Sequence, residues 1–272
     1  MTDRVAPWIA VLEEQAQPCA VLCHADPDRQ SAGRLGGLPA IAGIHDWPRV
    51  DGRPLSFVAE IDLAAIGAVF DAAWLPRSGR LHFFYDMVEW PGGIDPADRG
   101  HWAVLFTPAD SLAGMAGRPP DLPSDLLFPT APLAATRAIS YPEPLLLEER
   151  LGRLGDLSDS EWQRIYDHRS RDERRPLHQI GGHPSPIQAP DLGYECQLAS
   201  NGVYLGGPEG YASPQAAALA PGAGDWRLLL QVDSDERADM MWGDVGMLYF
   251  MIREPDAMAR DFSRTWLMMQ CT

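Results

Sequence analysis

The chain has 272 residues, 46% of them hydrophobic, which is enough to bury a sizeable core in one large or two small domains. Its formal net charge of −16 argues against a nucleic-acid partner, because affinity for phosphates requires a basic face. All 22 basic residues are arginine, so a pyridoxal Schiff base and a Walker-type phosphate loop, which both need lysine, are excluded.

The first part of the chain predicts a helix followed by strands. Residues 6–17 have the apolar spacing of a helix, and residues 19–23 have the composition of a strand. Residues 26–54 are rich in glycine, proline and aspartate and predict an ordered loop system. Residues 54–63 alternate apolar and polar side chains, which predicts a half-buried strand, and after a short helix residues 79–86 predict another strand.

The middle of the chain predicts a connection followed by a helix. Residues 108–144 are rich in proline and predict a long irregular connection. Residues 157–175 predict a helix, because Ser158 and Glu161 have the spacing of a capping box before an apolar stripe. The arginines in the last part of this helix, Arg171 and Arg174 among them, favour a solvated helix end over a phosphate-binding patch.

The second half of the chain repeats the first in order. "DWRLLLQVDSD" (225–235) matches "PLSFVAEIDL" (54–63), and "GMLYFMI" (246–252) matches "GRLHFFY" (79–85). Similar order with loops of unequal length is typical of a duplicated unit with insertions. We therefore predict a mainly β (α+β) fold, an internally duplicated two-half β unit packed as one domain over residues 1–272, with a few peripheral helices. The halves are about 19–106 and 177–270, joined by a proline-rich and helical connection, 107–176.

A Gly-Gly-x-Pro sequence precedes this unit in both halves, as "LGGLP" and "IGGHP". The chain has neither the Gly-Lys-Ser/Thr of a phosphate loop nor a GxGxxG between a strand and a helix. We interpret both sequences as structural turns, in which glycine takes a positive φ and proline fixes the exit. The turn residues are Gly36, Gly37 and Pro39 in the first half and Gly181, Gly182 and Pro184 in the second.

These motifs together resemble the YwqG-like family, a widespread bacterial domain of unknown function. The resemblance covers roughly residues 33–270 and includes "GRPLSFVAEIDL", "HQIGGHPSPIQ", "MWGDVGMLYFMI" and "DFSRTW". It implies a mainly β fold in which two similar halves pack as a single unit. Glu60 stands where the family usually has glutamine, as at Gln231. The family has no established catalytic residues, so none is transferred to this chain.

Several polar or aromatic residues in and near the repeated motifs are candidates for a ligand or partner site. If equivalent positions of the two halves meet near a pseudo-twofold axis, these groups share one cleft. In the alternative that we prefer, they satisfy backbone groups of neighbouring loops. Trp90, in a loop before a proline, is a further candidate anchor for a partner, as is Trp47. The candidates are Asp46, Trp47, Glu60, Asp62, Gln188, Gln231, Asp233 and Asp244.

The sequence gives little support for a metal or a cofactor, and we predict neither. Residues 233–244 have the length of an EF-hand loop, but Arg237 and Ala238 stand at its fifth and sixth positions. We interpret this segment as an acidic surface loop, with calcium binding as a minor alternative. The cysteines at 19, 23, 196 and 271 form no CxxC pair, so we expect free, mostly buried thiols rather than a zinc site or a disulfide framework. A metal site at Cys19 and Cys23, which share one face of the predicted strand at 19–23, with the adjacent His24 is a small-minority alternative.

Composition also bears on the compartment. No stretch of the sequence approaches the roughly 18 to 20 apolar residues of a membrane span, so we expect no membrane partner. Carboxylates lie among the first fifteen residues, where a signal peptide needs an apolar run. Together with the cysteine pattern, these features predict a cytoplasmic protein.

Two functional hypotheses follow. The first is a non-enzymatic cytosolic binding module whose acidic surface acts on a basic protein partner, because complementary charge speeds encounter and limits wrong partners. One version is an immunity-like protein that blocks a basic toxin or nuclease. The second is an enzyme or small-ligand binder that uses a polar cleft between the halves, with Glu60, Asp62, Gln231 and Asp233 as candidates.

Overall fold

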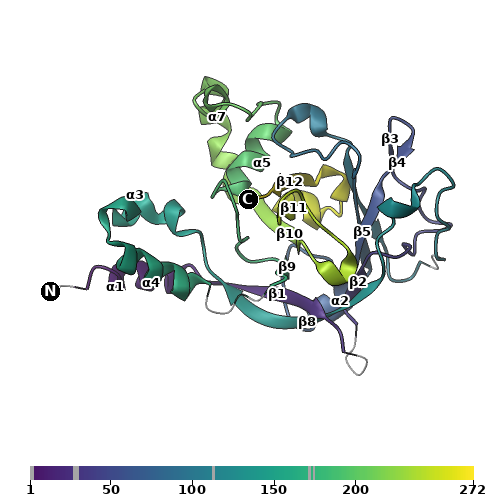
Figure 1. Cartoon of the computed structure of the whole chain (residues 1–272), viewed down its shortest axis with the longest axis horizontal. Coiled ribbons are helices and arrows are strands. Elements are labelled where there is room, and N and C mark those ends of the chain that lie inside the picture. Colours follow the sequence, from purple (N-terminus) through teal and green to yellow (C-terminus); the bar gives the residue numbers. More distant parts are fainter. Residues whose placement is uncertain (1–2, 27–30, 112–113, 171–172, 174) are drawn as a thin grey trace.

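The computed structural model describes residues 3–26, 31–111, 114–170, 173 and 175–272. Their main feature is one strongly curved, ten-stranded antiparallel sheet that approaches a barrel, so the mainly β prediction is confirmed (Figure 1). The strand order is β12-β11-β10-β9-β1-β8-β2-β5-β6-β7. The strands are β1 (Gln17–His24), β2 (Gly33–Leu35), β5 (Ser56–Asp62), β6 (Arg80–Tyr85), β7 (Trp102–Thr107), β8 (Ala131–Ser140), β9 (His178–Ile180), β10 (Trp226–Asp233), β11 (Met247–Arg253) and β12 (Trp266–Gln270).

A small two-stranded sheet and short helices surround this sheet. The small sheet pairs β3 (Arg49–Val50) with β4 (Arg53–Pro54). Among the described residues, none of the helices combines the length and the apolar character that crossing a bilayer requires. The helices are α1 (Ala6–Glu14), α2 (Leu63–Gly67), α3 (Glu148–Leu151), α4 (Asp159–Arg169), α5 (Leu192–Ser200), α6 (Pro208–Tyr211), α7 (Pro214–Leu219) and α8 (Glu254–Met258).

The two halves flank the central β1–β8 pair with the same order of strands. One side runs β2-β5-β6-β7 and the other β9-β10-β11-β12. Glu60 of β5 lies opposite His82, and Gln231 of β10 lies opposite Tyr249. The register shifts once in each pair, between Phe57 and Ala59 and between Leu228 and Leu230. The halves therefore share strand order and the place of a bulge, while their origin in a duplication stays a prediction.

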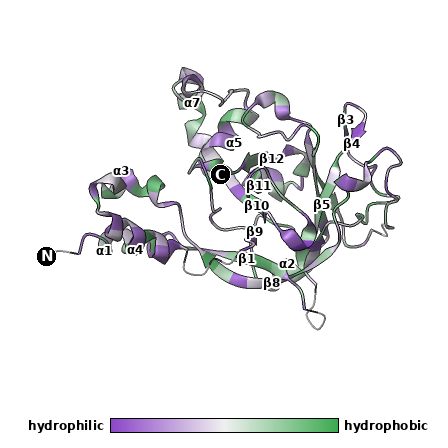
Figure 2. Ribbon diagram, in the orientation of Figure 1, coloured by the Kyte–Doolittle hydropathy of each residue, from purple (hydrophilic) through white to green (hydrophobic). Residues whose placement is uncertain are grey.

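One hydrophobic cluster includes residues from both halves. The rings of Phe83 and Phe250 meet edge to face with their centroids 5.0 Å apart, and both side chains are fully buried. Tyr85 packs against Trp242 in the same way at 6.0 Å. Aromatic and aliphatic side chains thus fill the space between the halves, and hydrophobic stretches mark strand β5 in Figure 2.

Strand β5 is buried on both faces, so the prediction of a half-buried strand is wrong. Every residue from Ser56 to Ile61 is buried. Val58 and Ile61 belong to the main core, whereas Phe57 packs with Ile41 in a second cluster formed by the loop before the strand. Apolar Phe57 and polar Glu60 both contact this loop and neither faces solvent, because loop residues cover the second face of the sheet.

The predicted irregular connection at 108–144 is also wrong in part, since it contains β8. This ten-residue strand pairs with the whole of β1, from Gln17 opposite Ser140 to His24 opposite Leu133. The prolines obscure the strand in the sequence, because they lie before and after it, and Pro132 is its second residue. Proline is tolerated near a strand start, where a missing N–H costs little.

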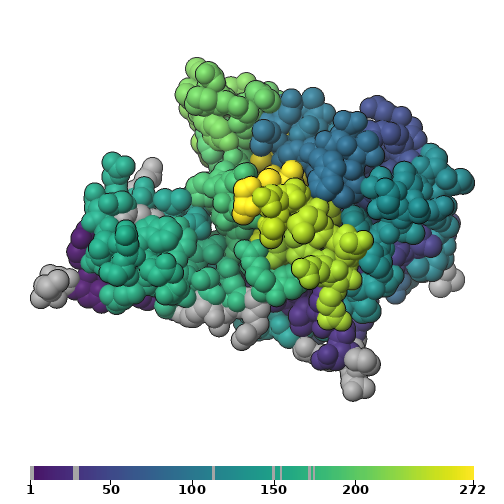
Figure 3. Space-filling view, in the orientation of Figure 1, coloured from purple at the N-terminus to yellow at the C-terminus, as the bar shows by residue number. Residues whose placement is uncertain are grey.

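Helices α1, α3 and α4 form a lobe at the end of the β1–β8 pair, away from the rest of the sheet (Figures 1 and 3). A separate cluster that includes Trp8, Leu12 and Ile165 holds it together. The predicted capping box of Ser158 and Glu161 is present at the start of α4. The helix ends at Arg169, earlier than predicted, and positions 171, 172 and 174 of that prediction lie outside the described residues.

Candidate functional site

The glycine pairs lie in tight turns that bring the backbone close to neighbouring segments. Gly36 and Gly37 have φ of +58° and +77°, and Gly181 and Gly182 have +69° and +66°. Gly36 N–H donates to Val58 O and Gly181 N–H to Leu228 O, both at 2.9 Å. A Cβ on Gly36 would collide with the carbonyl oxygen of Pro129. In both halves the glycines thus serve the backbone.

Glu60 and Gln231 hold these turns in corresponding ways. Glu60 Oε2 accepts from Ala40 N–H at 3.1 Å, and Gln231 Oε1 accepts from Ser185 N–H at 3.0 Å. Ala40 and Ser185 each follow the proline of their own turn. The two side chains therefore bind within their own halves, and the structure does not bring them together in a shared cleft.

The residues paired with Glu60 and Gln231 also correspond. Arg34 Nη1 lies 2.6 Å from Glu60 Oε1, and Arg34 Nη2 donates to Leu38 O. In the second half, Gln179 pairs with Gln231 in the sheet and donates to His183 O. The first half thus has an ion pair where the second has two neutral amides.

Most of the other predicted residues lie apart from one another. Asp62 caps α2 by accepting from Ala64 and Ala65 N–H. Trp47 is only partly exposed; its Nε1–H donates to Leu55 O and its ring packs on Phe84. Asp46, Gln188 and Asp244 are exposed, and the side chain of Trp90 is 37% exposed. Of the predicted polar residues, Asp233 lies in the pocket described next.

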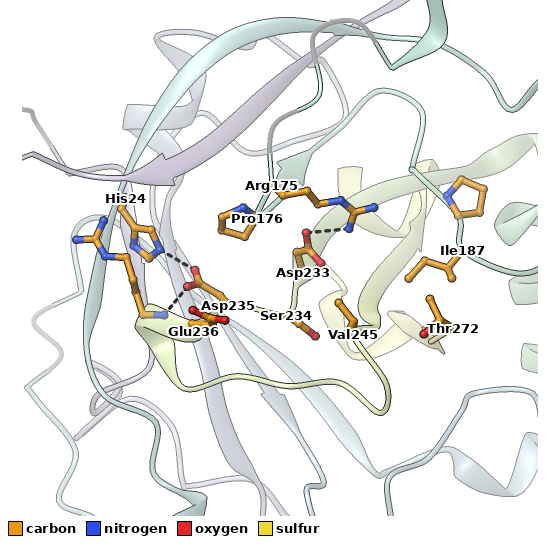
Figure 4. A pocket seen from close by; sticks show the side chains of 12 residues that line it. His24, Arg175, Pro176, Ile187, Asp233, Ser234, Asp235, Glu236, Val245 and Thr272 are labelled. Atoms are coloured by element: carbon orange, nitrogen blue, oxygen red, sulfur yellow. Dashed lines mark hydrogen bonds and ion pairs between the residues drawn. The ribbon is translucent and has the colours of Figure 1, made fainter. Parts of the chain in front are cut away.

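A pocket of about 670 Å³ opens beside the ends of β1 and β10 (Figure 4). Strand β1 contributes its last residue, the segment before β9 contributes an arginine and a proline, and the loop after β10 supplies most of the polar groups. We call it the His24–Asp235 pocket. It is lined by His24, Arg175, Pro176, Pro186, Ile187, Asp233, Ser234, Asp235, Glu236, Arg237, Val245 and Thr272.

Asp235 binds two imidazoles at the wall of this pocket. Its Oδ2 lies 2.7 Å from His24 Nε2 and 2.9 Å from His178 Nε2. The backbone N–H of Asp233 donates to His178 Nδ1 at 3.1 Å. A backbone N–H can only donate, so His178 Nδ1 is unprotonated and its Nε2–H donates to Asp235. His178 is thus a fully buried support that fixes the carboxylate.

The charges of this group follow from burial and from its contacts. Burial by itself raises the pKa of Asp235, but the hydrogen bond from His178 and the neighbouring imidazoles outweigh it and lower the pKa to about 2. Burial, helped by the nearby Arg237, lowers the pKa of His24 in spite of the attraction of Asp235. At neutral pH the pocket therefore has an ionised Asp235 whose Oδ2 lies 2.7 Å from Nε2 of a neutral His24.

Asp233 orients an arginine at the other side of the pocket. Its Oδ2 accepts from Arg175 Nη1 at 2.9 Å and from Leu177 N–H at 2.8 Å. These contacts use the carboxylates of Asp233 and Asp235 for protein partners and not for a cation. In the described part of the chain, no group of three or more histidine, cysteine, aspartate or glutamate side chains is arranged to hold a metal ion.

A second hollow, of about 740 Å³, shares His24, Arg175 and Pro176 with the first. We call it the adjoining groove. It runs over the β1–β8 pair, and its remaining lining is mostly aliphatic. The other residues that line it are Val21, Leu22, Cys23, Thr136, Arg137, Ala138 and Ile139.

This site is not visible in the sequence, because its parts are distant in the chain. His24 entered only as a neighbour of Cys23, and Asp235 only as part of a calcium-like loop. One usable signal was the alternation of β1, which places His24 on the same face as the buried Ala20 and Leu22. The neighbours that give His24 its chemistry come from β9 and from the loop after β10, and their position follows from the order of strands.

Comparison with known proteins places nine of the ten strands of the sheet, all but β1, in one family. Among curated proteins, none matches this sequence. The family model described as a domain of unknown function, DUF1963, matches residues 33–271. The match begins at β2 and runs beyond the end of β12, so it includes both groups of strands and most of the pocket lining. The chain therefore belongs to the DUF1963 family of domains of unknown function.

Proposed function

We propose that this protein binds a small molecule in the His24–Asp235 pocket. The observation that supports this proposal is the pocket itself, whose volume of about 670 Å³ is within the usual range of small-molecule sites. Its lining combines an aliphatic surface with a few polar groups that are fixed by buried contacts, and such fixed groups give a site its specificity.

The groups fixed in this way are suited to hydrogen bonding with a ligand. His24 Nε2 lies 2.7 Å from Asp235 Oδ2, and Asp233 holds Arg175 by one of its guanidinium nitrogens. A side chain that is already oriented loses less conformational entropy when a ligand binds. The pocket therefore replaces the cleft between the halves, which aromatic side chains fill, as the proposed site of a ligand.

A variant that fills the pocket tests this proposal. Val245 lines the pocket and its side chain is 54% exposed, so Val245→Trp is expected to block the pocket without disturbing the core. Native mass spectrometry and a ligand-observed NMR fragment screen should detect bound small molecules with the unchanged protein, and at least about 10-fold weaker binding with V245W. Met258→Trp, at a side chain 63% exposed and outside the pocket lining, is the matched control. Equal binding by V245W and the unchanged protein, or no binder in either measurement, contradicts the proposal.

A second candidate function rests on the net charge of −16, which favours a basic protein partner. In this version the protein is a non-enzymatic binding module that covers the basic face of its partner, as an immunity-like protein does. Affinity capture from lysate at about 50 mM and about 300 mM salt should yield a basic protein whose retention falls as salt rises. A partner without net positive charge, or retention that does not change with salt, would reject this candidate.

We also infer that the chain belongs to a bacterial, YwqG-like branch of its family and acts in the cytoplasm. The motifs at 33–39 and 180–188 support the branch, and the four free cysteines suit a reducing compartment. Cell fractionation of a bacterium that encodes the protein should recover it with cytoplasmic markers.

A further inference from the structure

We propose that the ligand of the His24–Asp235 pocket is an organic anion with an aliphatic body, and that Arg137 and Arg175 bind its acidic group in the adjoining groove. This inference rests on the proposed function, because it names the chemical class of ligand for the same site.

The charge of the adjoining groove favours an anion. Arg137 and Arg175 line it, and no carboxylate does. Arg137 lies on β8 opposite Ala20 and is exposed, and within the described residues its side chain has neither an ion pair nor a hydrogen bond. The chain as a whole has 38 acidic residues against 22 arginines, so a carboxylate-free hollow with two arginines is a local exception. A concave surface with charges of one sign concentrates ligands of the opposite sign.

Arg175 is held in place and still has free donors. Asp233 binds its Nη1 at 2.9 Å, and Leu177 N–H in turn fixes Asp233. The side chain of Arg175 is still 61% exposed. A guanidinium has five N–H donors in a fixed fork, so the ion pair with Asp233 leaves donors for a second oxyanion. Figure 4 shows Arg175 extended above Asp233, with Pro176 between it and His24.

The apolar lining of both hollows favours a ligand with an aliphatic body. In the adjoining groove it comes from Val21, Leu22, Ala138, Ile139 and Pro176, and in the pocket from Pro176, Pro186, Ile187 and Val245. All of these side chains are aliphatic or proline, and no phenylalanine, tyrosine or tryptophan lines either hollow. The side chain of Ile139 is 38% exposed. A ligand with an aliphatic body removes this surface from water, which favours binding in proportion to the area covered.

The experiment uses ligands that differ only in their head group. Decanoate, decanol and decylamine have the same alkyl chain, and inorganic phosphate is an anion without one. Isothermal titration of the full chain at pH 7 should show decanoate binding at least about 10-fold more tightly than decanol, since a charge-assisted hydrogen bond adds to the affinity. Decylamine and phosphate should bind more weakly than decanoate, and the affinity for decanoate should fall as salt rises.

Arginine variants locate the anion. Arg137→Ala and Arg175→Ala should each weaken decanoate binding about 10-fold and leave decanol binding unchanged. Arg77→Ala is the matched control, because Arg77 lies outside both linings and its side chain is 85% exposed. A thermal melting curve checks that each variant is folded. If the loss of the Arg175–Asp233 ion pair unfolds the chain, Arg137→Ala still provides the test.

Several outcomes overturn the inference. Equal affinity for decanoate and decanol removes the role of the charge, and equal affinity for phosphate and decanoate removes the role of the alkyl chain. An equal loss in the Arg77 variant shows a long-range effect of net charge and not a local contact. If decanoate does not bind while native mass spectrometry still finds a ligand that V245W loses, the inference fails and the proposed function remains.

Discussion

Replacing Phe250 with alanine is expected to lower the free energy of unfolding by about 3–5 kcal/mol. The side chain is fully buried and meets the fully buried Phe83 of the other half edge to face at 5.0 Å. Its removal leaves a cavity where the two halves meet, and the surrounding sheet cannot close over it. Urea denaturation followed by tryptophan fluorescence measures this change.

Met258→Ala is the control for this measurement, because its side chain is 63% exposed and its loss should change the free energy by less than about 0.5 kcal/mol. In the double variant Phe83→Ala and Phe250→Ala, the loss of unfolding free energy should be about 1 kcal/mol smaller than the sum of the two single losses. The reason is that each single change already removes the contact between the two rings. If Phe250→Ala costs less than about 1 kcal/mol, the two halves do not depend on this contact.

Replacing Glu60 with glutamine is expected to lower the free energy of unfolding by about 2–4 kcal/mol. The side chain of Glu60 is 7% exposed, and its loss of charge leaves Arg34, which is 20% exposed, without its partner at 2.6 Å. The ring Nδ1 of buried His82, 3.2 Å from Glu60 Oε2, loses its carboxylate as well. Partial exposure of Arg34 keeps the cost below that of a fully buried pair.

The second half of the protein supplies the control. Gln179 and Gln231 occupy the positions that correspond to Arg34 and Glu60, and their hydrogen bonds hold the second turn without charge. The double variant Arg34→Gln and Glu60→Gln should therefore regain most of the stability lost by Glu60→Gln alone. If the double variant loses as much stability as the two single variants together, a pair of glutamines cannot replace the ion pair in the first half.

The same carboxylate predicts a dependence on pH. Burial alone raises the pKa of Glu60, but the hydrogen bond from His82, the charge of Arg34 and the N–H of Ala40 outweigh it and lower the pKa from 4.5 to about 2. A folded pKa below the unfolded one stabilises the fold fully above pH 4.5, and this contribution is lost as pH falls toward 2. We expect the free energy of unfolding, measured by urea denaturation at several pH values between 4.5 and 2, to fall less steeply with decreasing pH in Glu60→Gln than in the unchanged protein. An equally steep fall in that variant would assign the acid sensitivity to other groups, such as Asp235.

Local sequence patterns predicted the local elements of this protein. Ser158 and Glu161 predicted the start of α4. The matching runs at 54–63 and 225–235 predicted the corresponding strands β5 and β10. Both kinds of signal depend on residues that are near neighbours in the chain. The glycine pairs lie in turns with positive φ, a conformation that glycine adopts without steric cost. These features depend on short stretches of chain and on the chemistry of single residues.

Only the tertiary structure decided which of these elements are neighbours. Strand β8 lies within a proline-rich stretch of the sequence. Its pairing with β1 places the strands of the two halves on either flank of this central pair, within one sheet. The place of β9 between β1 and β10 brings His24, His178 and Asp235 together, although no local pattern connects them. Composition determined the excess of acidic residues and the absence of lysine, but the position of each charge did not follow from it. Hydrogen bonds and ion pairs act over a few ångströms of space, so a site built from distant segments becomes visible only when the order of strands is known.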